Sequence, residues 1–350
     1  MIVIVGPTAV GKSSLAMALA QRFGGEIVNA DSRQVYRYMD IGTAKPTARE
    51  RAVVVHHLLD IVTPDQDFSL ATYQRLASKS ITGIHARGLV PLLVGGTGQY
   101  IRAVVEGWQV PRVAPDLRFR DQLAREVAVR GGRALYTRLE RLDPQAAAQI
   151  HPHNTRRVVR ALEVIHTTGC RFSELQRRET PPYSILQLGL TMERDRLYER
   201  IDHRVDDMIA QGLVAEVEDL LRRGYGLDLP AMSSIGYREI GQHLRGNLEL
   251  SKAIELTKFE THRYARQQYT WFRLKDPHIR WFDAGFADTT DQAIEAVTNF
   301  LSSGTDTKQQ PDPRGSGENQ DPSLGQPLDS EFRRNDDECV MTVIDSDDPW

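Results

Sequence analysis

Cysteine is almost missing from this sequence, because Cys170 and Cys339 are the only two and no Cys-x-x-Cys pair occurs. Two distant cysteines argue against a disulfide framework or a cysteine-rich zinc site, and they fit a reducing cytoplasm. No apolar run is long enough to cross a bilayer. A core strand is expected from Ile2, which leaves no room for a signal peptide. We therefore expect a cytoplasmic protein without a membrane segment.

The charge of the chain is low but unevenly distributed. The net charge is −3 over 350 residues, yet residues 303–350 contain twelve Asp/Glu and four Lys/Arg, a net charge of −8. The remaining body is therefore +5, which suits an anionic partner, although solvated charged faces are common. Residues 303–350 are dominated by Pro, Gly, Ser, Asp and Gln, so we expect a disordered tail. The length suffices for an α/β core and a smaller second unit.

The strongest motif follows a short apolar run at the start of the chain. Residues 2–5 are β-branched and typical of a buried strand in a parallel sheet. Gly6, Gly11, Lys12 and Ser13 then match the phosphate-cradling pattern G-x-x-x-x-G-K-S, and leucines at helical spacing follow. Glycines turn backbone amides inward, the helix N-terminus adds a positive dipole, Lys12 adds charge and Ser13 can hold Mg²⁺. The motif predicts that a polyphosphate binds here, but not which one.

Two more predicted strands end beside this loop. Asp31 follows the strand at 25–30, where ligands of open α/β sheets bind; it is either a functional carboxylate or the cap of the next turn. The strand at 89–94 ends in glycines where a Walker B strand would carry Asp, which argues against an NTP-hydrolysing motor or switch. The turn at 95–98 either admits a ligand beside the Thr97 hydroxyl or is a plain tight turn.

The composition then changes to a block rich in Arg, Ala and Leu with helical periodicity. Glycine and proline breaks in this block predict helices at 117–130, 134–142 and 155–168, and a turn at 145–150. A strand at 185–190 returns to the sheet, so the block is an insertion rather than an appended domain. Arg156, Arg157 and Arg160 suit nucleic acid phosphates, or they are solvated and paired with neighbouring glutamates.

The rest of the chain is predicted to be mainly helical. Helices are expected at 68–86, 193–211, 213–223, 250–274 and 292–301, and a last strand at 278–282. Arg196, Arg200 and Arg204 share one helix face, so they either clamp a diphosphate or pair with the interleaved acidic residues. His56 and His57 are adjacent on a short strand and point different ways, so we interpret them as structural rather than metal ligands.

Six motifs make the sequence resemble the bacterial tRNA dimethylallyltransferases. They are GPTAVGKS (6–13), DSRQVY (31–36), MDIGTAKP (39–46), LVGGTGQY (93–100), RALEV (160–164) and IGYRE (235–239), in the family's order over about residues 1–285. A lone P-loop is weakly specific, whereas this ordered set is strongly specific. Some eukaryotic relatives carry a C-terminal zinc finger, which two distant cysteines cannot form.

The resemblance implies an α/β fold, with a P-loop NTPase-like parallel-sheet core and an all-helical insertion domain. The core would comprise residues 1–116 and 181–302, the insertion that grips the tRNA anticodon stem-loop residues 117–180, and the acidic tail residues 303–350. It implies transfer of a dimethylallyl group from dimethylallyl diphosphate to N6 of the adenosine just 3′ of the anticodon, in tRNAs that read codons starting with U. Mg²⁺ would be the cofactor, and we expect a monomer.

The resemblance also implies roles for single residues. Asp31 would be the general base for the N6 proton, Thr97 would hydrogen-bond near that amine and Arg200 would neutralise the leaving diphosphate. Ser13 would be the metal ligand. The diphosphate would be bound by Gly6, Pro7, Thr8, Ala9, Val10, Gly11, Lys12 and Ser13. The tRNA would be contacted by Asp31, Ser32, Arg33, Gln34, Thr97, Arg118, Thr155, Arg156, Arg157, Val158 and Val159.

Three other activities share parts of this pattern. A prenyltransferase acting on free AMP, ADP or ATP would give the basic insertion no polymer to hold. A small-molecule P-loop kinase would need an acidic Mg²⁺ ligand and an arginine-rich lid over ATP. A non-catalytic RNA-binding protein would have no use for an intact Lys12, Ser13 and Asp31.

Overall fold

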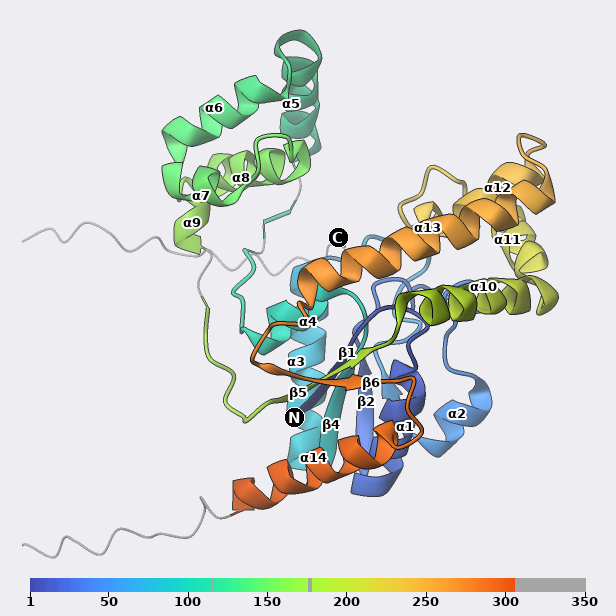
Figure 1. The fold of residues 1–350 in the computed structure, drawn as a ribbon. Coiled ribbons are helices and arrows are strands. Elements are labelled where there is room, and N and C mark those ends of the chain that lie inside the picture. Colours follow the sequence, from blue (N-terminus) through green and yellow to red (C-terminus); the bar gives the residue numbers. More distant parts are fainter. Residues whose placement is uncertain (112, 115, 176–177, 306–350) are drawn as a thin grey trace, which may run out of the picture.

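A six-stranded parallel sheet forms the centre of the molecule (Figure 1). The computed structural model describes residues 1–305 except 112, 115 and 176–177. The strands are β1 (Ile2–Val5), β2 (Gly25–Asn29), β3 (His56–His57), β4 (Val90–Val94), β5 (Leu186–Thr191) and β6 (Ile279–Asp283). Their order is β3-β2-β4-β1-β5-β6 and every neighbouring pair is parallel. The predicted parallel α/β core is confirmed.

Strand β1 lies near the middle of the sheet and is buried on both faces. Ile2 and Ile4 point to one face, and Val3 and Val5 point to the other. Helices α1 (Lys12–Phe23) and α14 (Thr289–Thr305) cover the first face, and α3 (Leu70–Ala86) and α4 (Gly98–Val105) cover the second. A strand covered on both faces needs a continuous apolar run, which the N-terminus provides.

The helices that follow β5 form a second layer with its own core. They are α10 (Arg194–Ala210), α11 (Leu213–Arg222), the 3₁₀ turn η1 (Ala231–Ser233), α12 (Tyr237–Leu244) and α13 (Leu250–Trp271). Helices α10 and α13 pack side by side at the edge of the sheet where β1 ends (Figure 1). Leu213, Val217 and Tyr237 form the core of this layer together with Val35 and Met39, which belong to the loop after β2. The layer is thereby joined to that loop.

The insertion forms a separate lobe that projects from the sheet (Figure 1). Its helices are α5 (Leu117–Arg130), α6 (Gly132–Leu142), α7 (Pro144–Gln149), α8 (Thr155–Thr168) and α9 (Phe172–Leu175). Leu123, Leu139 and Leu162 belong to a hydrophobic core that contains only insertion residues. Where the chain leaves and re-enters the sheet domain, the Glu179 amide donates to the Gly107 carbonyl at 2.8 Å.

Two expectations about the helices were wrong. Residues 145–150 were predicted as a turn but belong mostly to α7, because Pro144 occupies the first helical position and the Asp143 side chain accepts a bond from the Ala146 amide at 2.9 Å. Helix α14 runs to Thr305, past the predicted start of the tail at 303. The other predicted helices agree with the structure to within a few residues. No helix in the described part of the chain is long and apolar enough to span a membrane.

Candidate active site

The loop between β1 and α1 adopts a conformation that needs its glycines. Gly6 and Gly11 have φ values of 141° and 106°. A side chain at Gly6 would also meet the carbonyl oxygen of Leu190 on β5, at 2.4 Å. Ser13, at the start of α1, is exposed and lines a cavity in front of the loop. The predicted strand, glycine loop and helix are therefore in place, with a hydroxyl facing the ligand side.

Lys12 folds back over this loop. Its Nζ donates to the carbonyl oxygen of Pro7 at 2.7 Å. Burial and the nearby charge of Arg204 lower the pKa of Lys12 to about 7, although Asp31 acts in the opposite direction. The loop thus holds a lysine that is only partly charged near neutral pH, and an anion bound in the loop would favour its charged form.

Diphosphate binding is therefore expected to take up a proton above neutral pH. The anion favours charged Lys12, so the pKa of Lys12 is higher in the complex than its value of about 7 in the free protein. Below pH 7 the lysine is already charged and affinity is flat, whereas above pH 7 affinity falls by up to about tenfold per pH unit. Calorimetry in buffers of different ionisation enthalpy measures the uptake. The variant Lys12→Arg stays charged over this pH range, so any proton uptake that it shows comes from the ligand. Equal proton uptake by this variant and the unaltered protein would contradict the expectation.

One buried amide joins this loop to the turn after β4. The Gln268 side chain on α13 accepts from the Thr8 amide at 2.7 Å and donates to the Gly96 carbonyl at 3.0 Å. A Cβ on Gly96 would lie 2.0 Å from the Gln268 amide nitrogen, and one on Gly95 would lie 2.2 Å from the Ala30 carbonyl oxygen. The two glycines at the position of the Walker B Asp therefore leave room for close packing of other parts of this protein, the Gln268 side chain and the Ala30 backbone.

Asp31 caps the turn after β2 and also lines the cavity. Its Oδ1 accepts from the Arg33 amide at 2.8 Å and so caps the turn after β2. The Asn29 side chain holds the Asp31 backbone from both sides, accepting from its amide at 3.0 Å and donating to its carbonyl at 3.1 Å. No hydrogen bond from the described residues reaches Oδ2, and Asp31 lines the cavity. One carboxylate oxygen is therefore available to a substrate.

Thr97 fixes the same turn from the opposite side. Its hydroxyl oxygen accepts from the Ser32 amide at 3.0 Å and its hydroxyl donates to the Ser32 hydroxyl at 3.3 Å. Tyr264 lies on the cavity wall nearby. Burial and the charge of Asp31 raise the pKa of Tyr264, while hydrogen bonds with Thr97 and Gln268 oppose the rise. The phenol therefore remains protonated at neutral pH and can act as a donor.

Two of the three arginines on the predicted face of α10, Arg200 and Arg204, line the cavity. Arg200 is exposed at its edge, whereas Arg204 is largely enclosed and its burial lowers its pKa, with Asp31 opposing. Of the two alternatives for this face, the clamp does not extend to Arg196, which lies beside Gly285, where an added Cβ would be 2.8 Å from its Nη1. The resemblance implied Arg200 as the catalytic arginine; Arg204 is the one that lies within the electrostatic reach of both Lys12 and Asp31.

The cavity in front of the P-loop is large enough for two reactants. Its volume is about 680 Å³, within the usual range for small-molecule sites. Lys12 and Arg204 contribute charge to it, and Leu213, Ile235 and Met208 contribute apolar wall. This combination suits a ligand with an anionic head and an apolar tail.

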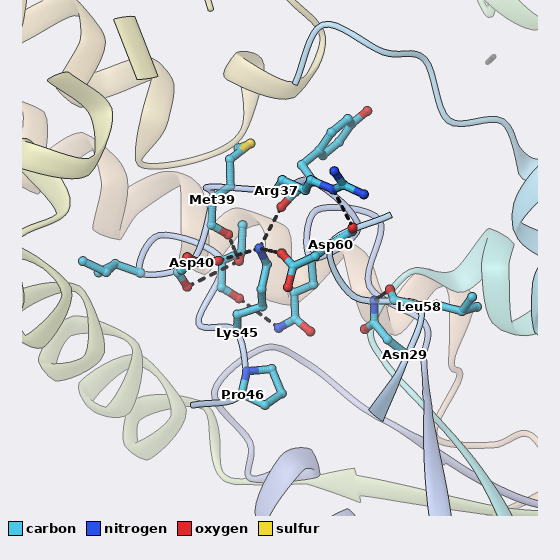
Figure 2. A network of polar contacts seen from close by, with 12 residues as sticks. Asn29, Arg37, Met39, Asp40, Lys45, Pro46, Leu58 and Asp60 are labelled. Atoms are coloured by element: carbon cyan, nitrogen blue, oxygen red, sulfur yellow. Dashed lines mark hydrogen bonds and ion pairs between the residues drawn. The ribbon is translucent and has the colours of Figure 1, made fainter. Parts of the chain in front are cut away.

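The loop 39–46 walls one side of the cavity and is held by a buried lysine (Figure 2). Lys45 Nζ donates to the Tyr36 carbonyl at 2.7 Å and to carboxylate oxygens of Asp40 and Asp60, both at 2.6 Å. Burial would raise the pKa of Asp60, but Lys45 and Arg51 outweigh it and hold that pKa below its usual value. The Gln34 amide donates to the Thr43 and Ala44 carbonyls at 3.0 and 3.2 Å, so its NH₂ group braces the wall.

Replacing Lys45 with methionine is expected to lower the free energy of unfolding by about 2–4 kcal/mol, because Asp60 would lose its buried partner. A chemical denaturation curve measures the change. Lys252→Met is the matched control, since it removes an exposed pair with Glu255 whose contribution is about 1 kcal/mol or less. Equal midpoints for the two variants would show that the network does not stabilise the fold.

The other end of the same loop is bound by one carboxylate. Glu216 on α11 accepts from the amides of Asp40, Ile41 and Gly42 at 3.0, 2.8 and 3.2 Å. It also accepts from the hydroxyl of Tyr237 at 2.6 Å, and burial together with Glu216 raises the pKa of Tyr237 well above its usual value. Motifs 39–46 and 235–239 are therefore adjacent in the fold, a pairing that the sequence alone did not suggest.

The predicted RNA contacts on the insertion lie apart from the cavity. Arg118, Arg156 and Arg157 are exposed, and no ion pair or side-chain hydrogen bond within the described residues engages their guanidiniums. Val158 was also predicted to contact the tRNA, but its side chain is fully buried in the core of the insertion, so it is not available for such a contact. Thr155 and Val159 are half-buried.

Arg160 and the histidine pair have structural partners. Arg160 and Arg120 both bind the fully buried carboxylate of Glu163, at 2.7 Å, which is the paired alternative for Arg160. His57 Nε2 lies 2.6 Å from a carboxylate oxygen of Glu26, and His56 Nδ1 lies 2.8 Å from the Val54 carbonyl oxygen. Both rings are therefore held by neighbouring groups of the sheet domain, as the structural interpretation of the pair predicts.

Comparisons with known proteins agree on one family. The IPP transferase family model matches residues 34–275, and the isopentenyl transferase model matches residues 1–60. A tRNA dimethylallyltransferase of Roseiflexus sp. is 53% identical over 86% of this chain and 98% of its own, and one of Dehalococcoides mccartyi is 50% identical over 87% and 93%.

Solved structures show the same likeness. A tRNA isopentenylpyrophosphate transferase of Bacillus halodurans is 44% identical, with a TM-score of 0.64 over 88% of this chain and 97% of its own. A eukaryotic dimethylallyltransferase acting on tRNA is 29% identical, with a TM-score of 0.74 over 87% and 79%. The parallel-sheet core and the insertion thus belong to one known architecture.

Proposed function

The chain belongs to the IPP transferase family, and we propose that it transfers a dimethylallyl group from dimethylallyl diphosphate to N6 of the adenosine just 3′ of the anticodon, in tRNAs that read codons starting with U. The observation that carries this proposal is the cavity in which the cations Lys12 and Arg204 share space with the available oxygen of Asp31. Transfer from a diphosphate to an amine needs cations for the leaving group and a carboxylate for the amine.

Asp31 acts on the nucleophile. The N6 lone pair is delocalised into the adenine ring, so the amine needs activation as the new nitrogen–carbon bond forms. Oδ2 accepts a hydrogen bond from N6 and takes its proton, while Oδ1 stays bound to the Arg33 amide. Thr97, tied to Ser32, orients the base beside Asp31. The bound Oδ1 fixes the carboxylate, so the second oxygen meets the amine in one orientation.

The opposite wall stabilises the leaving group. As the carbon–oxygen bond breaks, its electron pair stays on the diphosphate, where Lys12, Arg204 and the P-loop amides neutralise it. Arg200 adds charge from the exposed edge. Ser13 fits Mg²⁺, because its exposed hydroxyl stands at the motif's metal position and Mg²⁺ takes its remaining ligands from phosphate and water. Bound there, Mg²⁺ would supply further charge neutralisation to the diphosphate.

The adenosine must leave its stack to enter the cavity. Arg33 and Gln34 lie at the cavity wall, and Arg118, Arg156 and Arg157 present exposed guanidiniums on the insertion. RNA is recognised through unstacked loop bases and backbone phosphates, which these groups suit. A cytoplasmic, monomeric enzyme is part of the same proposal.

Prenyl transfer by the purified protein tests the proposal. The protein is given dimethylallyl diphosphate, Mg²⁺ and an unmodified tRNA with adenosine 3′ of the anticodon, with AMP and ATP in parallel reactions. Mass spectrometry of the digested nucleosides should find the dimethylallyl group on tRNA only. Product on AMP would indicate a mononucleotide prenyltransferase instead. ATP turnover without any prenylated product would favour a kinase.

A further inference from the structure

Arginine supplies the positive charge of the insertion, which contains no lysine. Residues 117–180 contain thirteen arginines, no lysine and seven Asp/Glu, a net charge of +6. The buried carboxylate of Glu163 binds two of these arginines, Arg120 and Arg160. Several others are left facing solvent, and the ones that gather between two helices are the subject of the inference.

These arginines line a groove between α5 and α6. Its volume is about 500 Å³, and it is lined by Glu126, Arg130, Arg133, Ala134, Thr137, Arg138 and Arg141. With four arginines and one glutamate, the groove carries a net charge of +3. We call this set the α5–α6 groove. None of these residues lines the cavity at the P-loop, so this is a separate site.

The groove has a defined geometry along α6. Arg133, Thr137 and Arg141 are four residues apart and so share one face of the helix. Eight residues separate the two arginines, a distance of about 12 Å along the helix axis. Arg130 joins them from the end of α5. Positive charge is therefore spread along a line, as an extended anion needs, and is not concentrated at one point.

Most of the guanidinium groups in the groove lack an ion-pair partner among the described residues, and two of them are positioned by aromatic rings. Within the described residues no hydrogen bond or ion pair engages the guanidiniums of Arg130, Arg133 and Arg141. Arg133 lies over the ring of Tyr136 at 5.4 Å, and Arg138 lies over the ring of Phe119 at 5.7 Å with Glu126 at 3.7 Å. A surface held together by salt bridges would place carboxylates beside these arginines. The groove contains one carboxylate, that of Glu126, and this carboxylate pairs with Arg138.

The groove runs along α6 and reaches the end of the lobe away from the sheet. Helix α5 begins beside the connection to the sheet domain and ends at the turn with α6, which is the far tip of the insertion in Figure 1. Fourteen residues of helix span about 20 Å, so an RNA held at the groove must extend well beyond the nucleotide in the cavity. The arginines at the start of α8 are a different set.

We propose that the α5–α6 groove binds backbone phosphates of the substrate RNA in the part of the molecule beyond the anticodon stem-loop. The inference rests on the proposed function. Arginine suits this role because its planar guanidinium binds phosphate oxygens in pairs. The groove contributes affinity for long RNA and takes no part in the chemistry, since phosphate contacts position a nucleic acid without reading its sequence.

The test compares two substrates and two variants. The triple variant Arg130→Ala, Arg133→Ala, Arg141→Ala removes three exposed charges, and its control, Arg22→Ala, Arg49→Ala, Lys79→Ala, removes three exposed charges from sheet-domain helices. Prenyl transfer is measured with full-length tRNA and with the isolated anticodon stem-loop. The groove variant should raise KM for tRNA by about tenfold or more, with kcat unchanged, and leave KM for the stem-loop unchanged. The salt dependence of tRNA binding should weaken by about two to three in log–log slope.

The other outcomes separate the two proposals. If the KM values for both RNAs rise together, or if the groove variant behaves like its control, the groove does not bind the distal RNA. If the unaltered protein modifies no tRNA at all, the proposed function fails and the groove is not at issue. Far-UV circular dichroism of both variants shows whether the insertion helices remain folded.

Discussion

Replacing Asp31 with asparagine is expected to lower kcat by about 10²- to 10⁴-fold, the usual contribution of a general base. The fold should survive, because an asparagine Oδ1 still accepts the bond from the Arg33 amide that caps the turn after β2. Asparagine cannot take the N6 proton. KM for tRNA should change little, since the phosphate contacts are elsewhere. Single-turnover rates with preformed enzyme–tRNA complex measure the chemical step directly.

The electrostatic role of Asp31 must be separated from its role as a base. Asp31 raises the pKa of Lys12, so its removal lowers that pKa and weakens diphosphate binding above pH 7. Assays at saturating dimethylallyl diphosphate remove this second effect. Asp31→Ala, which also loses the turn cap, is the control for local structure. Full kcat in the asparagine variant would show that Asp31 positions the turn and does no proton transfer.

Arg204→Gln is expected to lower kcat/KM by about 10²- to 10³-fold, the loss typical of one buried group that stabilises developing charge. Arg200→Gln should cost about tenfold or less, because Arg200 is exposed and water screens its charge. Both arginines line the cavity, so each serves as the control for the other. A larger fall in kcat/KM for Arg200→Gln than for Arg204→Gln would indicate that Arg200 is the catalytic arginine, as the resemblance implied.

Arg204→Gln should also leave a second signature. Arg204 lowers the pKa of Lys12, so its removal raises that pKa and moves the fall in diphosphate affinity to higher pH. Arg200→Gln should leave the pH of that fall unchanged, because Arg200 is not among the charges that shift Lys12. Titration of diphosphate affinity between pH 6 and 9 distinguishes the two variants even where their rates are similar.

Local patterns in the sequence were enough for most of the fold. The apolar run of β1 and the helical spacing of α5 and α8 each depend on neighbours in the chain, so their bounds could be predicted. Helix α7 was missed although Asp143 and Pro144 are local start signals, because its six residues pack through Ala147 into the insertion core, which the sequence does not show. A short helix of that kind has little periodicity to detect.

The candidate site shows the same division. The P-loop is a contiguous motif, and Lys12, Ser13 and Asp31 were predicted from it and from strand ends. Helical spacing placed Arg196, Arg200 and Arg204 on one face, but that face extends past the end of the cavity, so only two of them reach it. Gln268 was not predicted, because its two partners are about 170 and 260 positions away. Contacts over such separations leave no local pattern.

The carboxylate of Glu216 has a mechanical consequence for the cavity. The P-loop and Asp31 belong to the sheet, whereas the loop 39–46 is fastened to α11 by three amides and to α12 through Tyr237. The two walls of the cavity are therefore held by different parts of the fold. The width of the cavity between these walls depends on how the layer containing α11 and α12 packs against the sheet. Substitutions in the core of that layer, which contact neither substrate, should therefore alter how easily bulky prenyl donors enter.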